Sequence, residues 1–377
     1  MRSCLLSMVM FEYQPLPDSS HIRLLKIPKS QDHYANENNK LPTFEIIDVP
    51  LGKVSSYMYT AISYVWGPPE PTYDINISTG TMSITRNLFT ALPYLIRFKT
   101  YLWIDQICIN QKDNDEKSSQ VLLMGKIYQL ASNTDIWLGE DDGTMRQIQY
   151  LHEIITELGA HMSFAPKTPD VLLARPTRVK LAGEATIEFF QLLLSKGEND
   201  YIGAALKVLA RPWFRRAWVV QEFILSGSSY FQVGSSSIGG RVFQGIMEAL
   251  SMAQLSTSVG FSNSGSLFRS VGYCALLNMI NRMEEMQGTR QPELAFFFLN
   301  RMASTTLAAD PRDKVYAFLS LISDARYRFN PNYNLELGQV CTETAKAFIE
   351  GSRTLDVLGL CRGVFRSSVD SPSWGED

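Results

Sequence analysis

The stretch Tyr101–Glu140, YLWIDQICINQKDNDEKSSQVLLMGKIYQLASNTDIWLGE, decides the fold of this chain. It opens with an apolar run, Leu102–Ile104, which ends in the carboxylate of Asp105. A polar loop that carries Asn110 and Gln111 follows. A short apolar run bounded by polar residues is typical of a buried strand. We therefore expect a strand with polar chemistry at its carboxyl end.

The same stretch continues with a helix of about five turns. Its apolar residues recur at three- and four-residue spacing and form one stripe: Val121, Met124, Tyr128 and Ala131. Asp113 and Glu116 have the spacing of a capping pair at its start. Asp135–Leu138 predicts a second strand. A strand, helix, strand unit favours a parallel pair with a right-handed crossover, and ligands bind beyond the carboxyl ends of such strands, where Asp105 lies.

The composition is that of a globular protein with an ample core. The chain has 377 residues, of which 45% are hydrophobic and 11% aromatic, enough for one large domain or two ordinary ones. A net charge of -3 gives no overall attraction to nucleic acid or to an anionic membrane. No segment has the roughly 18 consecutive apolar residues that a spanning helix needs. The sequence predicts no nucleic-acid partner and no membrane span.

The cysteines and histidines argue against disulfide and metal chemistry. The five cysteines are odd in number and scattered, without a CxxC pair, as is typical of reduced thiols in a cytosolic protein. None of the four histidines is spaced with cysteines or carboxylates as a zinc site requires. The N-terminal MRSCLLSMVMF lacks the small-residue cleavage site of a signal peptide. We expect a cytoplasmic protein with no metal site and no resident cofactor.

The rest of the chain predicts strands first and helices later. Apolar runs indicate strands at 22–27, 44–49, 57–65, 74–77, 82–84, 230–233 and 355–360. Helical periodicity starts at Asn87 and recurs at about 145–162, 184–196, 199–210, 241–255, 267–286 and 337–349. A helix is also expected to start at Asp310, because proline and an acid follow it. Two segments read as loops: the proline-broken 163–180 and the Gly/Ser-rich 234–240.

These elements divide the chain into three parts. Residues 1–56 are expected to form N-terminal strands and a loop, residues 57–235 a core domain with a helical insertion at about 145–210, and residues 236–377 a mostly helical C-terminal part. The core is expected to be an α/β fold with a mainly parallel, flavodoxin-like sheet flanked by helices.

Glu222 is the carboxylate that most needs an explanation, because it interrupts the apolar run from Ala217 to Leu225. A buried carboxylate requires a partner or a function. The structural interpretation is an ion pair with one of the nearby arginines: Arg211, Arg215 or Arg216.

Three other residues carry open alternatives. Asp105 is either a ligand-binding or acid–base group or a loop cap. Trp66, which precedes Gly67 at a strand end, is either core or a platform for a planar ring. Cys108 is interpreted as a buried structural thiol, because no histidine neighbours it in the sequence. The common catalytic signatures GxSxG, HExxH, GxGxxG and the P-loop are absent from the sequence.

Five motifs, in order, resemble the fungal heterokaryon incompatibility (HET) domain family. They are AISYVWG at 61–67, LWIDQICINQ at 102–111, IYQLA with DIWLGE, RPWFRRAWVVQE at 211–222 and DPRDKVYAFLSL at 310–321. The closing SPSWGED is shorter than the family's usual run, so we expect either a truncated chain or a short member. The resemblance implies a cytosolic fungal protein that triggers cell death when unlike hyphae fuse.

The motif order is also similar, more distantly, to Toll/interleukin receptor (TIR) domains, which implies a TIR-like sheet. Trp218 followed by Glu222 is similar to the segment that carries the catalytic glutamate of NAD-cleaving TIR enzymes, although Val219 replaces the usual cysteine and about 70 residues separate Glu140 from Arg211. This similarity implies Glu222 as the catalytic residue. It also indicates ligand contacts from Ser63, Trp66, Gly67, Asp105 and Trp218. Asn110 and Gln111, in the polar loop after Asp105, and Arg211, which suits a phosphate, are further candidates for ligand binding.

The sequence leaves three functions open. One is a cell-death effector of fungal self/non-self recognition that acts as an NAD nucleosidase, with NAD or a related nucleotide as substrate. The second is a non-catalytic interaction module that signals through a homo-oligomer or a partner protein. The third is an enzyme that acts on another small molecule and uses the same fold.

Overall fold

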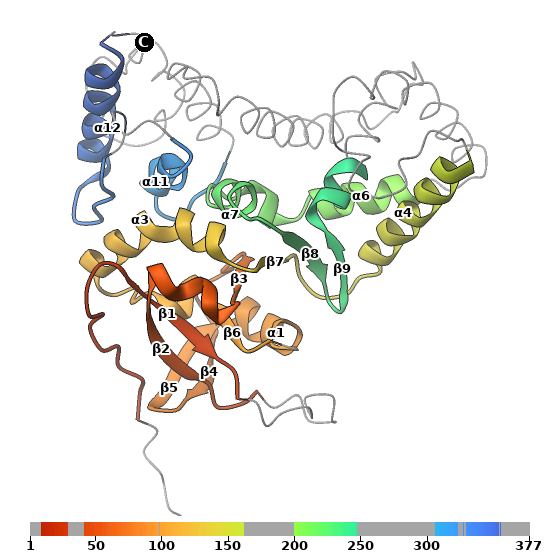
Figure 1. Ribbon diagram of the computed structural model, residues 1–377, viewed down its shortest axis with the longest axis horizontal. Coiled ribbons are helices and arrows are strands. Elements are labelled where there is room, and N and C mark those ends of the chain that lie inside the picture. The colour runs from red at the N-terminus through yellow and green to blue at the C-terminus, as the bar shows by residue number, and fades with distance from the viewer. Residues whose placement is uncertain are drawn as a thin grey trace, which may run out of the picture. The chain divides into compact units, whose positions relative to one another are not determined.

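The computed structural model describes residues 9–28, 41–97, 99–161, 200–246, 306–322, 327, 329–353 and 355. The chain forms two compact units (Figure 1). The first unit comprises Met1–Asp135, Arg215–Gly227 and Met286–Asp377. The second unit comprises Ile136–Phe214 and Ser228–Glu285.

The first unit is built on a sheet with the strand order β2-β1-β6-β3-β7. Its strands are β1 (His21–Lys26), β2 (Glu45–Pro50), β3 (Thr60–Tyr64), β6 (Tyr101–Trp103) and β7 (Asn133–Trp137), the last of which ends in the second unit. At the centre β3 runs parallel to β6, whereas β1 pairs antiparallel with β6 and β2 antiparallel with β1. The predicted α/β fold with a parallel central sheet is confirmed, and the N-terminal strands extend that sheet with antiparallel pairs.

The strand, helix, strand order of Tyr101–Glu140 is confirmed, but the expected pairing of its two strands is wrong, because β3 lies between β6 and β7 in the sheet. A short helix, α2 (Asp105–Cys108), follows β6 and precedes the long α3 (Asn114–Leu130). Asp113 caps α3, since its Oδ1 accepts hydrogen bonds at 3.0 Å from the main-chain N of Asp115 and of Glu116. The predicted apolar stripe of α3 is buried in the core with Trp103 and Ala61.

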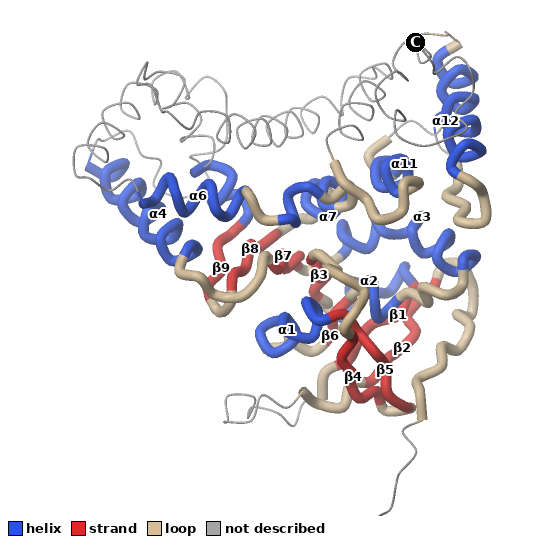
Figure 2. Tube along the Cα trace, turned by 180° about the vertical axis from the view of Figure 1, so that it is seen from behind, coloured by secondary structure: helices blue, strands red, loops and turns tan. Residues whose placement is uncertain are grey.

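Helix α3 lies next to the sheet of the first unit, and α11 (Asp313–Leu319) and α12 (Leu337–Ser352) lie on the far side of α3 (Figures 1 and 2). The first unit also contains α1 (Arg86–Leu95), α7 (Val219–Ile224) and the 3-10 helix η1 (Leu51–Tyr57). Helix α7 packs between α3 and α11. The predicted hairpin is β4 (Thr72–Ile77) with β5 (Gly80–Thr85). The structure changes two predicted boundaries. The strand expected at 57–65 is β3, which begins only at Thr60 because η1 extends to Tyr57. The helix expected to start at Asp310 is α11, which begins at Asp313 after a turn that Asp310 closes.

The second unit contains the end of β7, followed in the sheet by β8 (Ser229–Val233) and β9 (Ser236–Gly239). Helices α4 (Thr144–His161) and α6 (Asp200–Leu209) and the 3-10 helix η3 (Pro212–Arg215) complete its described part. Aromatic rings fill its core, with the Phe231 and Phe243 centroids 4.6 Å apart. The expectation of a loop at 234–240 is wrong, because 236–239 pairs with β8 and buries Ile238.

Several predictions lie outside the described residues: the loop at 163–180, the helices at 184–196 and 267–286, most of the helix at 241–255, the strand at 355–360 and the closing SPSWGED. The predicted division at residues 56 and 235 stays a prediction.

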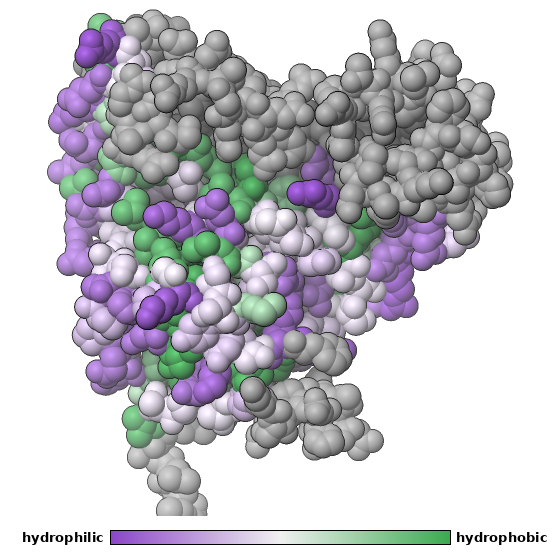
Figure 3. All heavy atoms as spheres, viewed as in Figure 1, coloured by the Kyte–Doolittle hydropathy of each residue, from purple (hydrophilic) through white to green (hydrophobic). Residues whose placement is uncertain are grey.

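Figure 3 shows apolar residues interspersed with polar ones on the visible face. Among the described residues, Met58 and Leu122 are large hydrophobic side chains that are 76% and 49% exposed. Isolated exposed hydrophobic side chains are common on protein surfaces. No helix in the described ranges is long and apolar enough to cross a membrane.

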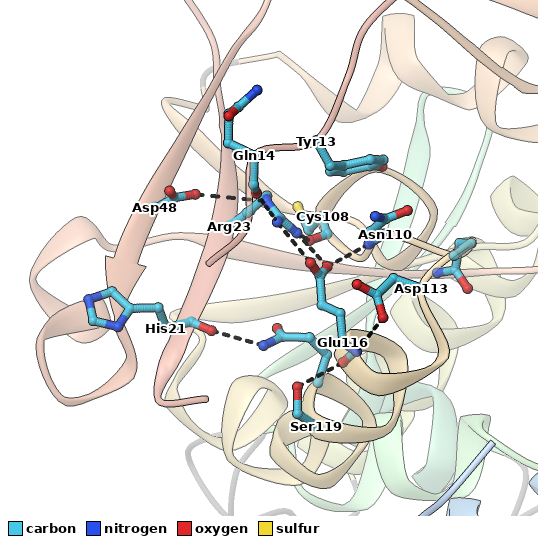
Figure 4. A network of polar contacts seen from close by, with 12 residues as sticks. Tyr13, Gln14, His21, Arg23, Asp48, Cys108, Asn110, Asp113, Glu116 and Ser119 are labelled. Atoms are coloured by element: carbon cyan, nitrogen blue, oxygen red, sulfur yellow. Dashed lines mark hydrogen bonds and ion pairs between the residues drawn. The ribbon is translucent and has the colours of Figure 1, made fainter. Parts of the chain in front are cut away.

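A buried arginine on β1 anchors the loop after β6 (Figure 4). The Arg23 side chain is 2% exposed and donates to both carboxylate oxygens of Glu116, at 2.5 and 2.9 Å. It also donates to the main-chain oxygens of Cys108 and Gln14, at 3.2 and 2.7 Å. Burial alone would lower the pKa of Arg23, but its bond to Glu116 raises it above its usual value. The guanidinium therefore stays charged and joins β1, α2 and α3.

The same network fixes the loop from Asp105 to Asp113. The Tyr13 ring lies 4.9 Å from the Arg23 guanidinium, and its hydroxyl donates to the Ile107 carbonyl at 2.9 Å. The main-chain N–H of Asn110 donates to Glu116 Oε1 at 2.7 Å. Glu116 thus stabilises this loop and leaves the capping of α3 to Asp113.

Replacing Arg23 by Met is expected to reduce the free energy of unfolding by roughly 3 kcal/mol, because Glu116 would remain buried without its partner. The matched control on the same strand is Lys26→Met. It breaks the exposed Lys26–Glu45 pair, whose side chains are 40% and 48% exposed, and should leave stability nearly unchanged. Urea unfolding followed by fluorescence measures both. Equal losses in the two variants would contradict a dominant role for the buried pair.

Candidate functional site

Two parallel strands of the first unit carry polar residues just beyond their carboxyl ends. β3 ends at Tyr64 and β6 at Trp103, and Trp66 and Asp105 follow them. The Trp66 Nε1–H donates to Asp105 Oδ2 at 2.8 Å, which joins the two loops. The other carboxylate oxygen of Asp105 accepts from the main-chain N–H of Gln106 at 2.7 Å. The site predicted at this edge of the sheet therefore has two of its residues in contact.

The loop after β3 turns at a glycine whose conformation other residues rarely adopt. Gly67 has φ +77°. Asn87, in α1, donates its side-chain N–H to the Val65 carbonyl. A Cβ on Gly67 would lie 3.7 Å from the Asn87 Cβ, so backbone strain, not crowding, selects glycine here. The turn and the Asn87 bond set the position from which half-buried Trp66 reaches Asp105.

Helix α7 adds a third component, the buried carboxylate of Glu222. Its side chain is 2% exposed, and Ser63 Oγ donates a hydrogen bond to its Oε2. Arg216 Nη1 lies 3.8 Å from the same oxygen and donates to the Tyr64 carbonyl. Of the three arginines considered as partners, Arg216 forms the ion pair. Ser63, Trp66, Asp105 and Glu222 thus gather in one place.

The charges of the site do not balance, since one guanidinium faces two carboxylates. Burial raises the pKa of Glu222 to about 7; Arg216 and Ser63 oppose this rise, and Asp105 adds to it. Burial also raises the pKa of Asp105, against the effects of Arg216 and Trp66. Burial alone would lower the pKa of Arg216, but Glu222 and Asp105 together raise it. Arg216 stays charged, whereas Glu222 exchanges its proton near neutral pH.

Two tyrosines that the sequence did not single out as site residues line the same cluster. Burial raises the pKa of Tyr64 well above its usual value, and Asp105 adds to this rise. Burial, Glu222 and Asp105 do the same for Tyr128, whose hydroxyl donates to the Ile62 carbonyl at 3.2 Å. Both phenols are therefore neutral. Tyr128 was expected only as part of the apolar stripe of α3, and no local pattern distinguishes a stripe residue that also faces a charged group.

The remaining predicted ligand contacts have other partners. Gln111 donates to the Asp105 carbonyl at 3.0 Å and so supports its main chain. Asn110 binds Glu116 through its main chain. Trp218 hydrogen-bonds Asp313 and packs against the main hydrophobic core.

Arg211 belongs to the second unit. It binds the Leu138 carbonyl and Asp142 Oδ2 there, both at 2.7 Å. A role for Arg211, Asn110, Gln111 or Trp218 in ligand binding stays a prediction.

Cysteine and metal chemistry receive no support from the described part of the chain. Cys108 is fully buried, and burial raises the pKa of its thiol to about 12, so it is not a thiolate at neutral pH. The interpretation of Cys108 as a structural thiol agrees with this. Within the described ranges, no group of three or more His, Cys, Asp and Glu is arranged to hold a metal ion.

Comparison with known proteins identifies the family that this site resembles. Residues 59–222 match the family model "Heterokaryon incompatibility protein (HET)". The chain is 27% identical over 412 aligned positions to heterokaryon incompatibility protein 6, OR allele, of Neurospora crassa. The alignment covers 94% of this chain and 57% of that relative's length. No solved structure matches the chain. The resemblance to the HET family is confirmed, and the matched segment ends at Glu222.

Replacing Glu222 by Gln is expected to raise the melting temperature at pH 8 and to change it much less at pH 5. The folded pKa of about 7 exceeds the ordinary 4.5, so the native state binds this proton more tightly than the unfolded chain. The stabilising effect of the proton is present below pH 4.5 and is lost as the pH rises through 7. Glutamine mimics the protonated form, so the difference should grow with pH to a few degrees.

Differential scanning calorimetry across pH 5 to 8.5 measures this effect. Glu343→Gln, on the exposed face of α12, is the matched control and should show no pH-dependent difference. A variant that melts below the wild type at pH 8 would show that ionised Glu222 stabilises the fold.

Proposed function

From the match of residues 59–222 to the HET family, we propose that this chain is a cytoplasmic effector of fungal heterokaryon incompatibility that triggers cell death by cleaving NAD. The similarity to an incompatibility protein of Neurospora crassa supports the cellular role. The buried Glu222, with its pKa raised to about 7 beside Ser63 and Arg216, is the observation that supports the chemistry.

The proposed reaction breaks the bond between the nicotinamide nitrogen and C1 of the ribose. The bonding electron pair goes to the nicotinamide nitrogen, which becomes neutral, and the sugar becomes an oxocarbenium ion. Water then adds to C1 and loses a proton. A carboxylate stabilises that cation most strongly in a site of low dielectric constant, and a fully buried Glu222 offers this setting.

Neighbouring groups fit the same substrate. Ionised Glu222 can accept hydrogen bonds from the ribose hydroxyls, as glycosidase carboxylates do. The Trp66 ring is held by its bond to Asp105 and provides a face on which a base can stack. Arg216 limits the pKa of Glu222 to about 7, so a large fraction of the carboxylate is ionised in a neutral cytoplasm.

The second function, a non-catalytic interaction module, has one observation in its favour. Arg216 lies 3.8 Å from Glu222, so the carboxylate already has a charged partner without any substrate. On this alternative the ion pair holds α7 in place, and signalling proceeds through a homo-oligomer or a partner protein. The two functions differ in whether Glu222→Gln abolishes the effect of a folded protein.

Purified protein incubated with NAD is expected to release nicotinamide, and Glu222→Gln should reduce the rate by at least about a hundredfold, because the amide cannot stabilise the cation. The rate should fall as the pH is lowered through about 7, since Glu222 takes up its proton there. Chromatography of nicotinamide across pH 5.5 to 9 measures both effects. Glu343→Gln is the control. No release from the wild type at high protein concentration would refute NAD cleavage.

Expression in a fungal host is expected to kill cells with the wild type and to spare them with Glu222→Gln at equal protein level. The glutamine variant keeps the shape of the site and removes only its charge, so a purely structural interaction surface should survive the change. Viable counts after induction, with immunoblots for protein level, give the comparison. Killing by Glu222→Gln as strong as by the wild type would favour the interaction module.

A further inference from the structure

We infer that residues 306–322, which lie outside the family-matched 59–222, are a working part of the site, with Asp313 as a positioning residue that acts on Glu222 through Trp218. This inference rests on the proposed function for its catalytic consequence. Its geometric basis is independent of that function, because all the elements involved belong to the first unit.

The first contact of this segment is made by Leu307, which binds the main chain on both sides of Arg216. The Leu307 N–H donates to the Arg215 carbonyl at 2.5 Å, and the Ala217 N–H donates to the Leu307 carbonyl at 3.0 Å. These bonds form a short parallel bridge between Arg216 and Leu307. The main chain on both sides of the site arginine is therefore fixed by a residue about 90 positions away in the sequence.

The second contact lies next to Glu222. Gln221 is 1% exposed. In the amide orientation that satisfies both of its polar atoms, its NH2 group donates to Ser320 Oγ at 2.7 Å and to the Ala317 carbonyl at 3.0 Å. Its oxygen accepts from the Gly125 N–H at 2.7 Å. One buried side chain thus joins α7 to both α11 and α3, and a buried amide is costly to leave unpaired.

The third contact fixes the start of α7. Asp313 accepts hydrogen bonds from Trp218 and from the Tyr333 hydroxyl, the latter at 2.5 Å. Trp218 is the first residue before α7, and its carbonyl accepts the N–H of Glu222 at 3.1 Å. A displacement of the Trp218 ring would therefore turn the helix that carries Glu222.

Helices α3, α7 and α11 pack closely where these contacts meet. A Cβ added to Gly125 of α3 would lie 2.6 Å from the Ser320 Cβ and 3.1 Å from Leu225 Cδ1. The first distance is shorter than real Cβ atoms adopt and the second is tight, so the ends of α7 and α11 lie close against α3 at this glycine. Because packed interiors respond to small volume changes, a shift of α11 cannot be absorbed before it reaches α7.

Asp313→Ala and Trp218→Phe test the positioning role, since each removes one end of the same hydrogen bond. Both should lower kcat for nicotinamide release by at least about tenfold, with little change in KM, because a small displacement of a catalytic group is costly. The double variant should lose little more than either single variant. Glu343→Ala on α12 is the matched control, since this carboxylate is 51% exposed, pairs with Lys346 and lies outside residues 306–322.

A second readout does not depend on NAD cleavage. The difference in melting temperature between the protein with Glu222 and its Glu222→Gln variant, measured against pH, reports the pKa of Glu222. In the Asp313→Ala background this difference should arise at lower pH, because a loosened α7 lets water reach the carboxylate. The Glu343→Ala background should leave the pH dependence of this difference as it is with wild-type Glu343.

The two readouts separate the possible failures. If the wild type releases no nicotinamide but the pH of the melting difference shifts only in Asp313→Ala, NAD cleavage fails and the positioning role stands. Equal effects of Asp313→Ala and Glu343→Ala in both readouts, or no shift in either, would overturn the positioning role.

Discussion

The burial of the Glu222 carboxylate in an apolar helix is the constraint on which the site depends. Removing a carboxylate from water costs several kcal/mol unless charge and hydrogen bonds offset it. Ser63 and Arg216 offset only part of this cost, since the pKa still rises to about 7. The surrounding structure must therefore hold α7 against the tendency of this group to reach solvent.

That support comes from elements far apart in the sequence. Arg23 of β1 and Glu116 of α3 fix the loop that presents Asp105. Leu307 and Asp313, about 90 residues further along the chain, fix the residues from Arg215 to Trp218, which precede Glu222. The close approach of Ser320 and Leu225 to Gly125 also restricts the movement of α7 relative to α3 and α11.

The sequence predicted the parts that carry local signals. Periodicity and the Asp113 cap placed α3 well, and a carboxylate inside an apolar run singled out Glu222. Arg216 could not be chosen from its neighbours, because the choice depends on where α7 meets β3. The antiparallel pairing of β1 with β6 and the bond between Asp313 and Trp218 were missed for the same reason. Contacts between segments that are distant in the chain produce no periodic pattern in the sequence.

Two buried Arg–Glu pairs in the first unit differ in a way that bears on function. Glu116 binds Arg23 through both carboxylate oxygens, at 2.5 and 2.9 Å, as expected of a pair that only stabilises. Glu222 meets Arg216 at 3.8 Å, beyond hydrogen-bond distance, while Arg216 directs its donor to the Tyr64 carbonyl. A pair that served only to stabilise the fold would be more favourable at hydrogen-bond distance. The wider Arg216–Glu222 distance leaves the pKa of the carboxylate raised to about 7, and the proposed NAD cleavage depends on this raised pKa.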